Sequence, residues 1–304
     1  MRYDSGTMSC SLLSTSDADT LQRQPEATQP RVERCSLLRY ADGNLSSVRD
    51  SLVNEGELEI LAAGQESIRL YRTPGQDIQL VLGTLLTRGI IRRPEDVADI
   101  SFSEYELRTQ AQVGLRPQTP RRLSPVDLPQ NPADPESEPE GLRRGAERLF
   151  DFRDAFEQRQ RLYRATGAMH GAALFTRQGK LLTFAEDIGR HNAFDKAIGE
   201  AFADGTLARA EVAVLSSRLA LELIMKAAMA GITILAGLSV ATNTAVELAD
   251  ARGITLVGRL RSSSMNIYTH PWRLHGLSTQ PSSPGPEAAD EHRTLHLRGI
   301  QAKS

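Results

Sequence analysis

Residues 186–196 read EDIGRHNAFDK, a dense polar run between two apolar segments that are typical of a protein core. Before the run, residues 171–176 and 180–185 predict two strands joined by a tight turn. After it, Phe194 and Ile198 begin an apolar repeat at helical spacing. The run therefore lies where a strand turns into a helix, and it indicates that this half of the chain alternates strands with helices.

Such a turn exposes backbone N–H groups and the positive end of the helix dipole. Gly189 would let the backbone approach a ligand closely. We therefore expect an anion to bind here. A charged helix cap with a surface ion pair explains the same residues, and both readings remain open at this point.

Three short β-branched runs follow, at residues 212–215, 232–236 and 254–257, separated by segments of helix length. This pattern predicts an α/β fold with a mostly parallel sheet and covering helices. Ligands of such sheets bind at the carboxyl ends of the strands, so the polar residues at those ends are informative.

Each of the three strand ends offers hydroxyls or a guanidinium, at residues 216–218, 239–244 and 261–264. Together with Arg190 and His191 they predict a phosphate-binding site, because arginines and helix N-termini suit phosphate oxygens. The helix after Ser217 carries Arg218, Glu222 and Lys226 at a spacing of four. That stripe faces either solvent or a polar cleft, and the spacing does not decide between them.

The first half predicts a small α+β unit. Residues 57–62 and 65–72 suggest a hairpin, residues 77–88 a helix that Gly89 ends, and residues 100–107 a further strand. The expected organisation is as follows: a disordered leader at 1–50, an α+β subdomain at 51–113, a Pro-rich linker at 114–144, an α/β cofactor-binding subdomain at 145–276 and a disordered tail at 277–304.

Composition excludes several classes of protein. The 304 residues are 40% hydrophobic and 24% charged, and the formal net charge of −2 gives no basic field that would favour nucleic acid. We found no apolar run of the ~20 residues that a membrane helix needs and no signal peptide, so we expect a cytoplasmic protein. The only cysteines, Cys10 and Cys35, cannot form a disulfide scaffold or a Cys-x-x-Cys site.

Familiar catalytic motifs are also missing. The chain has neither a Walker motif nor Gly-x-Gly-x-x-Gly. Zinc-dependent deamination needs His-x-Glu, but Gly171 and Ala172 follow His170. A Ser-His-Asp hydrolase stays a weaker rival without a Gly-x-Ser-x-Gly elbow; its members would come from Ser216 or Ser239, His170 or His191, and Asp187 or Asp195.

Five motifs resemble the formate dehydrogenase accessory sulfurtransferases (FdhD). They are TGAMHGAA at 166–173, the run at 186–196, and the segments 216–226, 239–246 and 258–271. A weaker match covers residues 72–91, and the similarity spans roughly residues 55–275.

The resemblance implies a cytidine-deaminase-like α/β fold without zinc, usually dimeric. It also implies that a cysteine desulfurase supplies sulfur, which passes to the molybdenum cofactor (bis-molybdopterin guanine dinucleotide) for a molybdenum-dependent formate dehydrogenase. GDP is a possible partial ligand. The cofactor-binding residues that we expect from the residues and the resemblance together are His170, Asp187, Gly189, Arg190, His191, Asn192, Ser216, Arg218, Arg259, Leu260, Arg261, Ser262, Ser263 and Ser264.

The chain departs from the family in its sulfur chemistry. The family carries sulfur on a Cys-x-x-Cys pair between the two halves, whereas residues 114–144 here contain no cysteine. Serine and threonine cannot replace a thiolate at neutral pH. Two hypotheses follow: a working accessory sulfurtransferase, which would need Cys10 or Cys35, or a non-catalytic relative that binds the cofactor or a guanine nucleotide without sulfur transfer.

Overall fold

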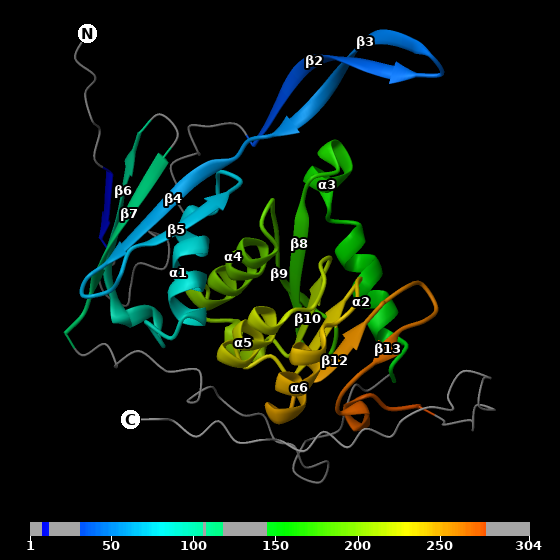
Figure 1. Ribbon diagram of the computed structural model, residues 1–304. Coiled ribbons are helices and arrows are strands. Elements are labelled where there is room, and N and C mark those ends of the chain that lie inside the picture. The colour runs from blue at the N-terminus through cyan, green and yellow to red at the C-terminus, as the bar shows by residue number, and fades with distance from the viewer. Residues whose placement is uncertain (1–7, 12–30, 106–107, 118–144, 278–304) are drawn as a thin grey trace, which may run out of the picture.

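The computed structural model describes residues 8–11, 31–105, 108–117 and 145–277. They form a five-stranded sheet, a six-stranded sheet and a separate two-stranded ribbon (Figure 1). None of the helices in these ranges is long and apolar enough to cross a membrane.

The five-stranded sheet has the order β1-β6-β7-β4-β5 and packs against one helix, α1. Its elements are β1 (Met8–Ser11), β4 (Gly56–Ala62), β5 (Ile68–Arg72), α1 (Asp77–Thr87), η2 (Pro94–Asp96), β6 (Val97–Glu104) and β7 (Arg108–Leu115). The predicted hairpin is confirmed as the antiparallel pair β4–β5, and the predicted helix is confirmed as α1. Gly89 ends α1 with a φ of 70°, and its N–H donates to Leu86.

The six-stranded sheet has the order β13-β12-β11-β10-β8-β9. Its elements are α2 (Arg148–Glu157), α3 (Arg161–Thr166), β8 (His170–Phe175), β9 (Leu181–Asp187), α4 (Arg190–Ala203), η5 (Leu207–Arg209), β10 (Val212–Leu215), α5 (Leu221–Met229), β11 (Ile234–Gly237), α6 (Asn243–Ala251), β12 (Thr255–Gly258), β13 (Asn266–Ile267) and η6 (Pro271–Arg273).

The α/β class is confirmed, but the sheet is mixed rather than mostly parallel. Only β10, β11 and β12 run parallel to each other. The pairs β8–β9, β8–β10 and β12–β13 are antiparallel. The connection between β8 and β9 is too short for the crossover that a parallel pair requires, so this pair must be a hairpin.

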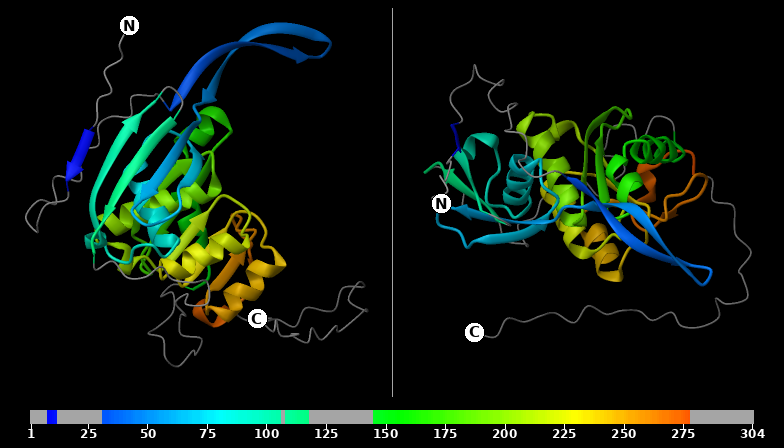
Figure 2. Two further views of the ribbon diagram at one scale, coloured as in Figure 1. Left: turned by 60° about the vertical axis from the view of Figure 1, so that its left-hand side comes forward. Right: turned by 90° about the horizontal axis from the view of Figure 1, so that it is seen from above.

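The two-stranded ribbon corrects the predicted leader. Residues 32–50, expected to be disordered, form β2 (Val32–Ala41) and most of β3 (Asn44–Val53). Asp42 and Gly43, both with positive φ, make the two-residue turn, and Asp-Gly is a strong hairpin signal that the polar composition concealed. The ribbon projects away from both sheets (Figures 1 and 2).

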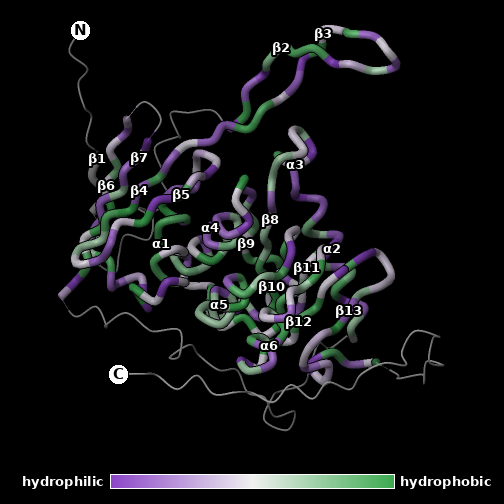
Figure 3. The backbone as a smooth tube through the Cα atoms, in the orientation of Figure 1, coloured by the Kyte–Doolittle hydropathy of each residue, from purple (hydrophilic) through white to green (hydrophobic). Residues whose placement is uncertain are grey.

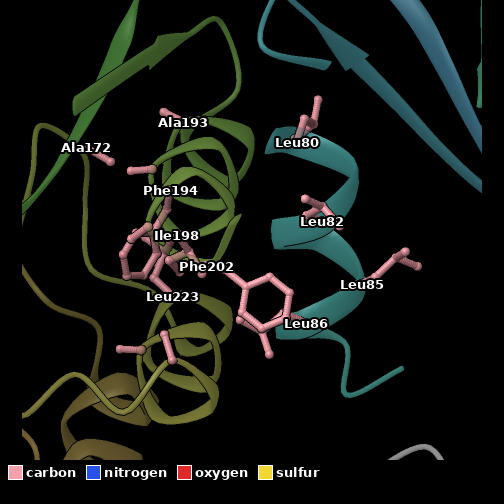
Figure 4. Close-up of a cluster of buried hydrophobic side chains, with 14 of the residues drawn as sticks. Leu80, Leu82, Leu85, Leu86, Ala172, Ala193, Phe194, Ile198, Phe202 and Leu223 are labelled. Carbon is pink, nitrogen blue, oxygen red and sulfur yellow. The ribbon is translucent and has the colours of Figure 1, made fainter. Parts of the chain in front are cut away.

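The two sheets share one core because α1 packs closely on α4. A Cβ atom on Gly83 would lie 1.9 Å from the carbonyl oxygen of Asp195, so only glycine allows this approach. Figure 4 shows buried side chains at this contact, including Leu86 and Phe202. A second cluster, with Phe152 and Phe156 of α2, covers the other face of the six-stranded sheet. The hydrophobic segments accordingly gather inside the two sheet layers (Figure 3).

Candidate functional site

Topology brings most of the predicted residues to one edge of the six-stranded sheet. His170, at the start of β8, lies opposite Asp187, at the end of β9. Because β8 runs antiparallel to β10, the start of β8 also lies beside Ser216, which follows β10. The carboxyl ends of β11 and β12 meet at the same edge, since these strands are parallel to β10.

A pocket of about 720 Å³ opens at this edge, beside α2 and α3. Its lining includes three residues from the strand ends, His170, Ser216 and Leu238. The rest of its lining consists of Glu157, Gln160, Tyr163, Arg164, Gly167, Ala168 and Met169. The sequence did not single out these last residues: Gly167, Ala168 and Met169 belong to the motif at 166–173, of which only His170 was expected to bind, and the other four lie in or beside α2 and α3, outside any motif.

The His170 side chain is positioned by Ser216. The backbone N–H of Gly171 donates to Ser216 Oγ over 3.0 Å, and the same oxygen lies 3.2 Å from His170 Nδ1. Burial lowers the pKa of His170, and the positive charges of Arg190 and Arg218 lower it further. These effects favour the neutral imidazole at pH 7.

The first turn of α4 contains two buried nitrogens that lack hydrogen-bond partners among the described residues, Arg190 Nε and His191 Nε2. The other ring nitrogen of His191 lies 3.1 Å from Glu222 Oε2. Burial lowers the pKa of His191 more than Glu222 raises it. Glu222 accepts from Nδ1–H, so Nε2 of the neutral His191 ring is an acceptor. Arg190 Nε–H is therefore the orphaned donor of the pair, and at a helix N-terminus it suits an incoming acceptor such as an anion.

Asp187 has a different role from the predicted one. Its carboxylate is fully buried and accepts from four donors: Lys196 Nζ at 2.7 Å, the N–H groups of Thr73 at 3.1 Å and Gly189 at 2.8 Å, and Asn192 Nδ2 at 3.0 Å. We call these five residues the Asp187 hub. It joins the segment after β5 to the turn between β9 and α4. Asp187, Gly189 and Asn192 therefore hold the backbone of the turn in place, and neighbouring residues form the surface of the site.

Arg218 is exposed and precedes α5. Arg218, Glu222 and Lys226, which the sequence places on one stripe of the helix, lie in different environments. Lys226 points inward and binds Asp195 over 2.7 Å, with Thr87 3.0 Å away, while Glu222 lies largely in solvent. The expectation that the stripe faces solvent is thus wrong for Lys226. The close α1–α4 packing buries Asp195, and this carboxylate needs a cation as its partner.

The segment after β12 reaches the same edge through its backbone. The N–H of Arg259, whose φ is 49°, donates to Ser239, and the Arg261 guanidinium donates to the carbonyl of Leu238, which lines the pocket. Leu260 is fully buried in the core, so its side chain cannot contact a ligand. Ser262, Ser263 and Ser264 are exposed.

This arrangement suits binding of an anion better than hydrolysis. Arg190, Arg218 and Arg261 supply positive charge. A Ser216–His170 pair would need an acid to orient the imidazole, but Ser216 already occupies Nδ1 and the Asp187 carboxylate is saturated by its own donors. Among the described residues, a Ser216–His170 hydrolase therefore lacks Asp187 as its third member.

Comparisons with known proteins agree with this fold. The model of the FdhD/NarQ family matches residues 53–275. "Sulfur carrier protein FdhD" of Streptomyces coelicolor is 36% identical over 263 residues, which cover 78% of this chain and 93% of that protein. The protein of the same name from Sulfolobus acidocaldarius is 31% identical over 259 residues, covering 80% and 99%.

A solved structure is also similar. The crystal structure of a candidate formate dehydrogenase accessory protein from Desulfotalea psychrophila superimposes with a TM-score of 0.67, covering 81% of this chain and all of that one. The identity is 21%, so this likeness bears on the fold.

Proposed function

Because this chain belongs to the FdhD/NarQ family, we propose that it is an accessory protein for a molybdenum-dependent formate dehydrogenase. In this proposal it binds the molybdenum cofactor, bis-molybdopterin guanine dinucleotide, as cargo at the strand-end site. The cofactor's phosphates are the groups that the site receives. The proposal includes a cytoplasmic location, a homodimer and a cysteine desulfurase as partner, as the sequence leads us to expect.

One observation carries the proposal: Arg190 Nε is buried at the first turn of α4 without a partner among the described residues. A phosphate oxygen would satisfy this donor. Arg218 is exposed and acts on His170 electrostatically, which supports a shared site. The pocket of about 720 Å³ beside His170 leaves room for a further part of the cargo.

We assign the residues distinct roles. Arg190, Arg218 and Arg261 neutralise phosphate charge, His191 and His170 each offer a ring nitrogen for hydrogen bonding, and Ser216 contacts the His170 ring. Arg259 and Ser262 to Ser264 remain candidates for contact with the cargo, since all four are exposed beside the end of β12. The Asp187 hub fixes the turn that presents Arg190.

The second candidate function is cofactor binding without sulfur transfer. It is favoured by the absence of any cysteine between Ser36 and Ser304. Sulfur carriage requires a thiolate that takes a sulfur atom from a donor persulfide and leaves the donor as a thiolate. Cys35 lies in β2 opposite Asp50 and is half-buried, so it is part of a hairpin and not of a free tether. Cys10 lies in β1 of the five-stranded sheet, where it pairs with Ile100 of β6.

Titration calorimetry with GDP tests the binding site. Arg218→Ala should weaken binding by about 1.5–3 kcal/mol, the usual contribution of a hydrogen bond to a charged group. Arg209→Ala removes an exposed arginine of η5, outside the site, and serves as the matched control. Unchanged affinity in Arg190, Arg218 and Arg261 variants alike would remove the site.

Mass spectrometry separates the two functions. After incubation with a cysteine desulfurase and cysteine, a sulfur carrier gains about 32 Da on a cysteine as a persulfide. A Cys35→Ser/Cys10→Ser variant is the control. An adduct on Cys35 that is lost in that variant, together with formate dehydrogenase maturation, establishes sulfur transfer. If the wild type gains no adduct but still binds GDP, the second function, binding without sulfur transfer, is supported.

A further inference from the structure

A second, larger pocket runs along β9, the edge strand of the six-stranded sheet. The pocket has a volume of about 900 Å³, and residues 181–184 and 186 of β9 line it. No other described strand pairs with the outer side of β9. In an antiparallel sheet every second residue of an edge strand directs its N–H and C=O outward, so this side offers unpaired backbone groups. We call this pocket the β9 groove.

The β9 groove is lined by more arginines than acids. Arg159, between α2 and α3, and Arg161, the first residue of α3, stand exposed on one side, and Arg31 lies at the end where the ribbon begins. Glu186 also reaches the groove, but its two oxygens accept from the backbone N–H groups of Leu162 and Tyr163, at 3.0 and 2.8 Å. Three arginines therefore line the groove, while both carboxylate oxygens of Glu186 already accept hydrogen bonds from the backbone.

The remaining acid, Glu200 of α4, is poorly solvated. Its Oε2 is buried and has no hydrogen-bond partner among the described residues. Burial, reinforced by Asp204, raises the pKa of Glu200 to about 7. Near neutral pH this carboxyl is thus partly uncharged and can donate to a carbonyl oxygen, so it offsets little of the positive charge.

Leu162, Leu181 and Phe184 add an apolar component to the same groove. A strand that enters it would direct alternate side chains to opposite faces of the sheet. One set would lie along the α2–α3 wall with its arginines, and the other along α4. The matching ligand is an extended segment in which acidic and apolar residues alternate.

We propose that the β9 groove binds an extended acidic segment of a partner protein, which adds to β9 as a seventh strand. Its backbone pairs with the free edge of β9, and its carboxylates meet Arg159, Arg161 and Arg31. A second copy of this chain fits less well, because a symmetric β9–β9 contact would bring two sets of the same arginines together. This interaction is separate from cargo binding at the strand-end site.

Fluorescence anisotropy tests the proposal with three fluorescein-labelled octapeptides on the full-length protein. The first alternates glutamate with valine, the second alternates lysine with valine, and the third is the glutamate peptide with alternate backbone nitrogens methylated. We expect the first to bind and the other two to bind about tenfold more weakly or not at all, since one loses charge complementarity and the other the strand pairing. Equal binding of all three peptides, or of none, overturns the proposal.

Charge reversal locates the site. Arg161→Glu should weaken the glutamate peptide about tenfold, whereas Arg209→Glu, on exposed η5 outside the groove, should leave it unchanged. GDP binding should be the same in both variants, so failure of this proposal is distinguishable from failure of the strand-end site. Displacement of the glutamate peptide by GDP, or dissociation of a homodimer by the peptide, would show another site or another occupant and would refute it.

Discussion

Replacing Asp187 with asparagine tests whether this residue is structural. The substitution keeps the shape of the side chain, so Oδ1 can still accept from Gly189 and Asn192. It replaces Oδ2 with an NH₂ group, which then faces two donors, Lys196 Nζ at 2.7 Å and the Thr73 N–H at 3.1 Å. Lys196 is 1% exposed and, among the described residues, retains the Thr73 carbonyl as its hydrogen-bond partner.

The expected cost follows from these contacts. Removing one partner of a buried ion pair destabilises proteins by about 3–5 kcal/mol, because the other charge stays buried and uncompensated. The unsatisfied Thr73 N–H belongs to the same network, so its cost overlaps with this figure. Stability totals about 5–15 kcal/mol for most domains, so Asp187→Asn should remove a large fraction of it.

Urea unfolding followed by circular dichroism measures this loss. With a slope of about 3 kcal/mol/M, the midpoint should fall by roughly 1–2 M. Lys196→Met in the same background should restore part of the stability, since it removes the stranded charge. The deficit should also shrink as the pH rises, because Lys196, whose pKa burial lowers, can then remain buried as the neutral amine. A loss of less than about 1 kcal/mol in the free energy of unfolding would refute the structural role of Asp187, which would again be a candidate ligand-binding residue.

Two further substitutions examine Glu200 and Ser216. Burial raises the pKa of Glu200 from 4.5 to about 7, so the folded state binds this proton more tightly and the contribution to stability falls as the pH rises from 4.5 through 7. Glu200→Gln should therefore stabilise the protein by about 1–2 kcal/mol at pH 8, after allowance for partial exposure, and have little effect at pH 4.5; equal urea midpoint shifts at both pH values would contradict this. Ser216→Ala should remove the hydrogen bond at His170 Nδ1 and shift the ¹⁵N NMR signal of that nitrogen, and Ser216→Thr should retain it; an unchanged spectrum in Ser216→Ala would be the opposing result.

The regular elements of the α/β half were predictable because their apolar periodicity is local. The run at 212–215 is β10, and the run at 254–257 became β12 with a shift of one residue. The turn before α4 was also predictable from its polar run. The ribbon of residues 32–53 was missed because it has little apolar periodicity, although Asp42-Gly43 carried a hairpin signal.

The roles of individual site residues depended on contacts between distant positions. Nothing near Asp187 in the sequence indicates that Thr73, 114 residues away, donates to its carboxylate. The inward orientation of Lys226 likewise depends on Asp195 and Thr87, from two other helices. The β9 groove combines residues from β9, three helices and the segment before the ribbon, so no single stretch predicts it.

The most direct test of the account is whether the protein carries the molybdenum cofactor. Protein purified from cells that make the cofactor should contain molybdenum by elemental mass spectrometry and release a fluorescent pterin after oxidation. We predict that both signals accompany the wild-type protein and fall together in an Arg190→Ala/Arg218→Ala variant that remains folded, while Arg209→Ala retains them. Absence of both signals from the wild type, or their full retention in the double variant, would contradict the claim that the strand-end site binds this cargo.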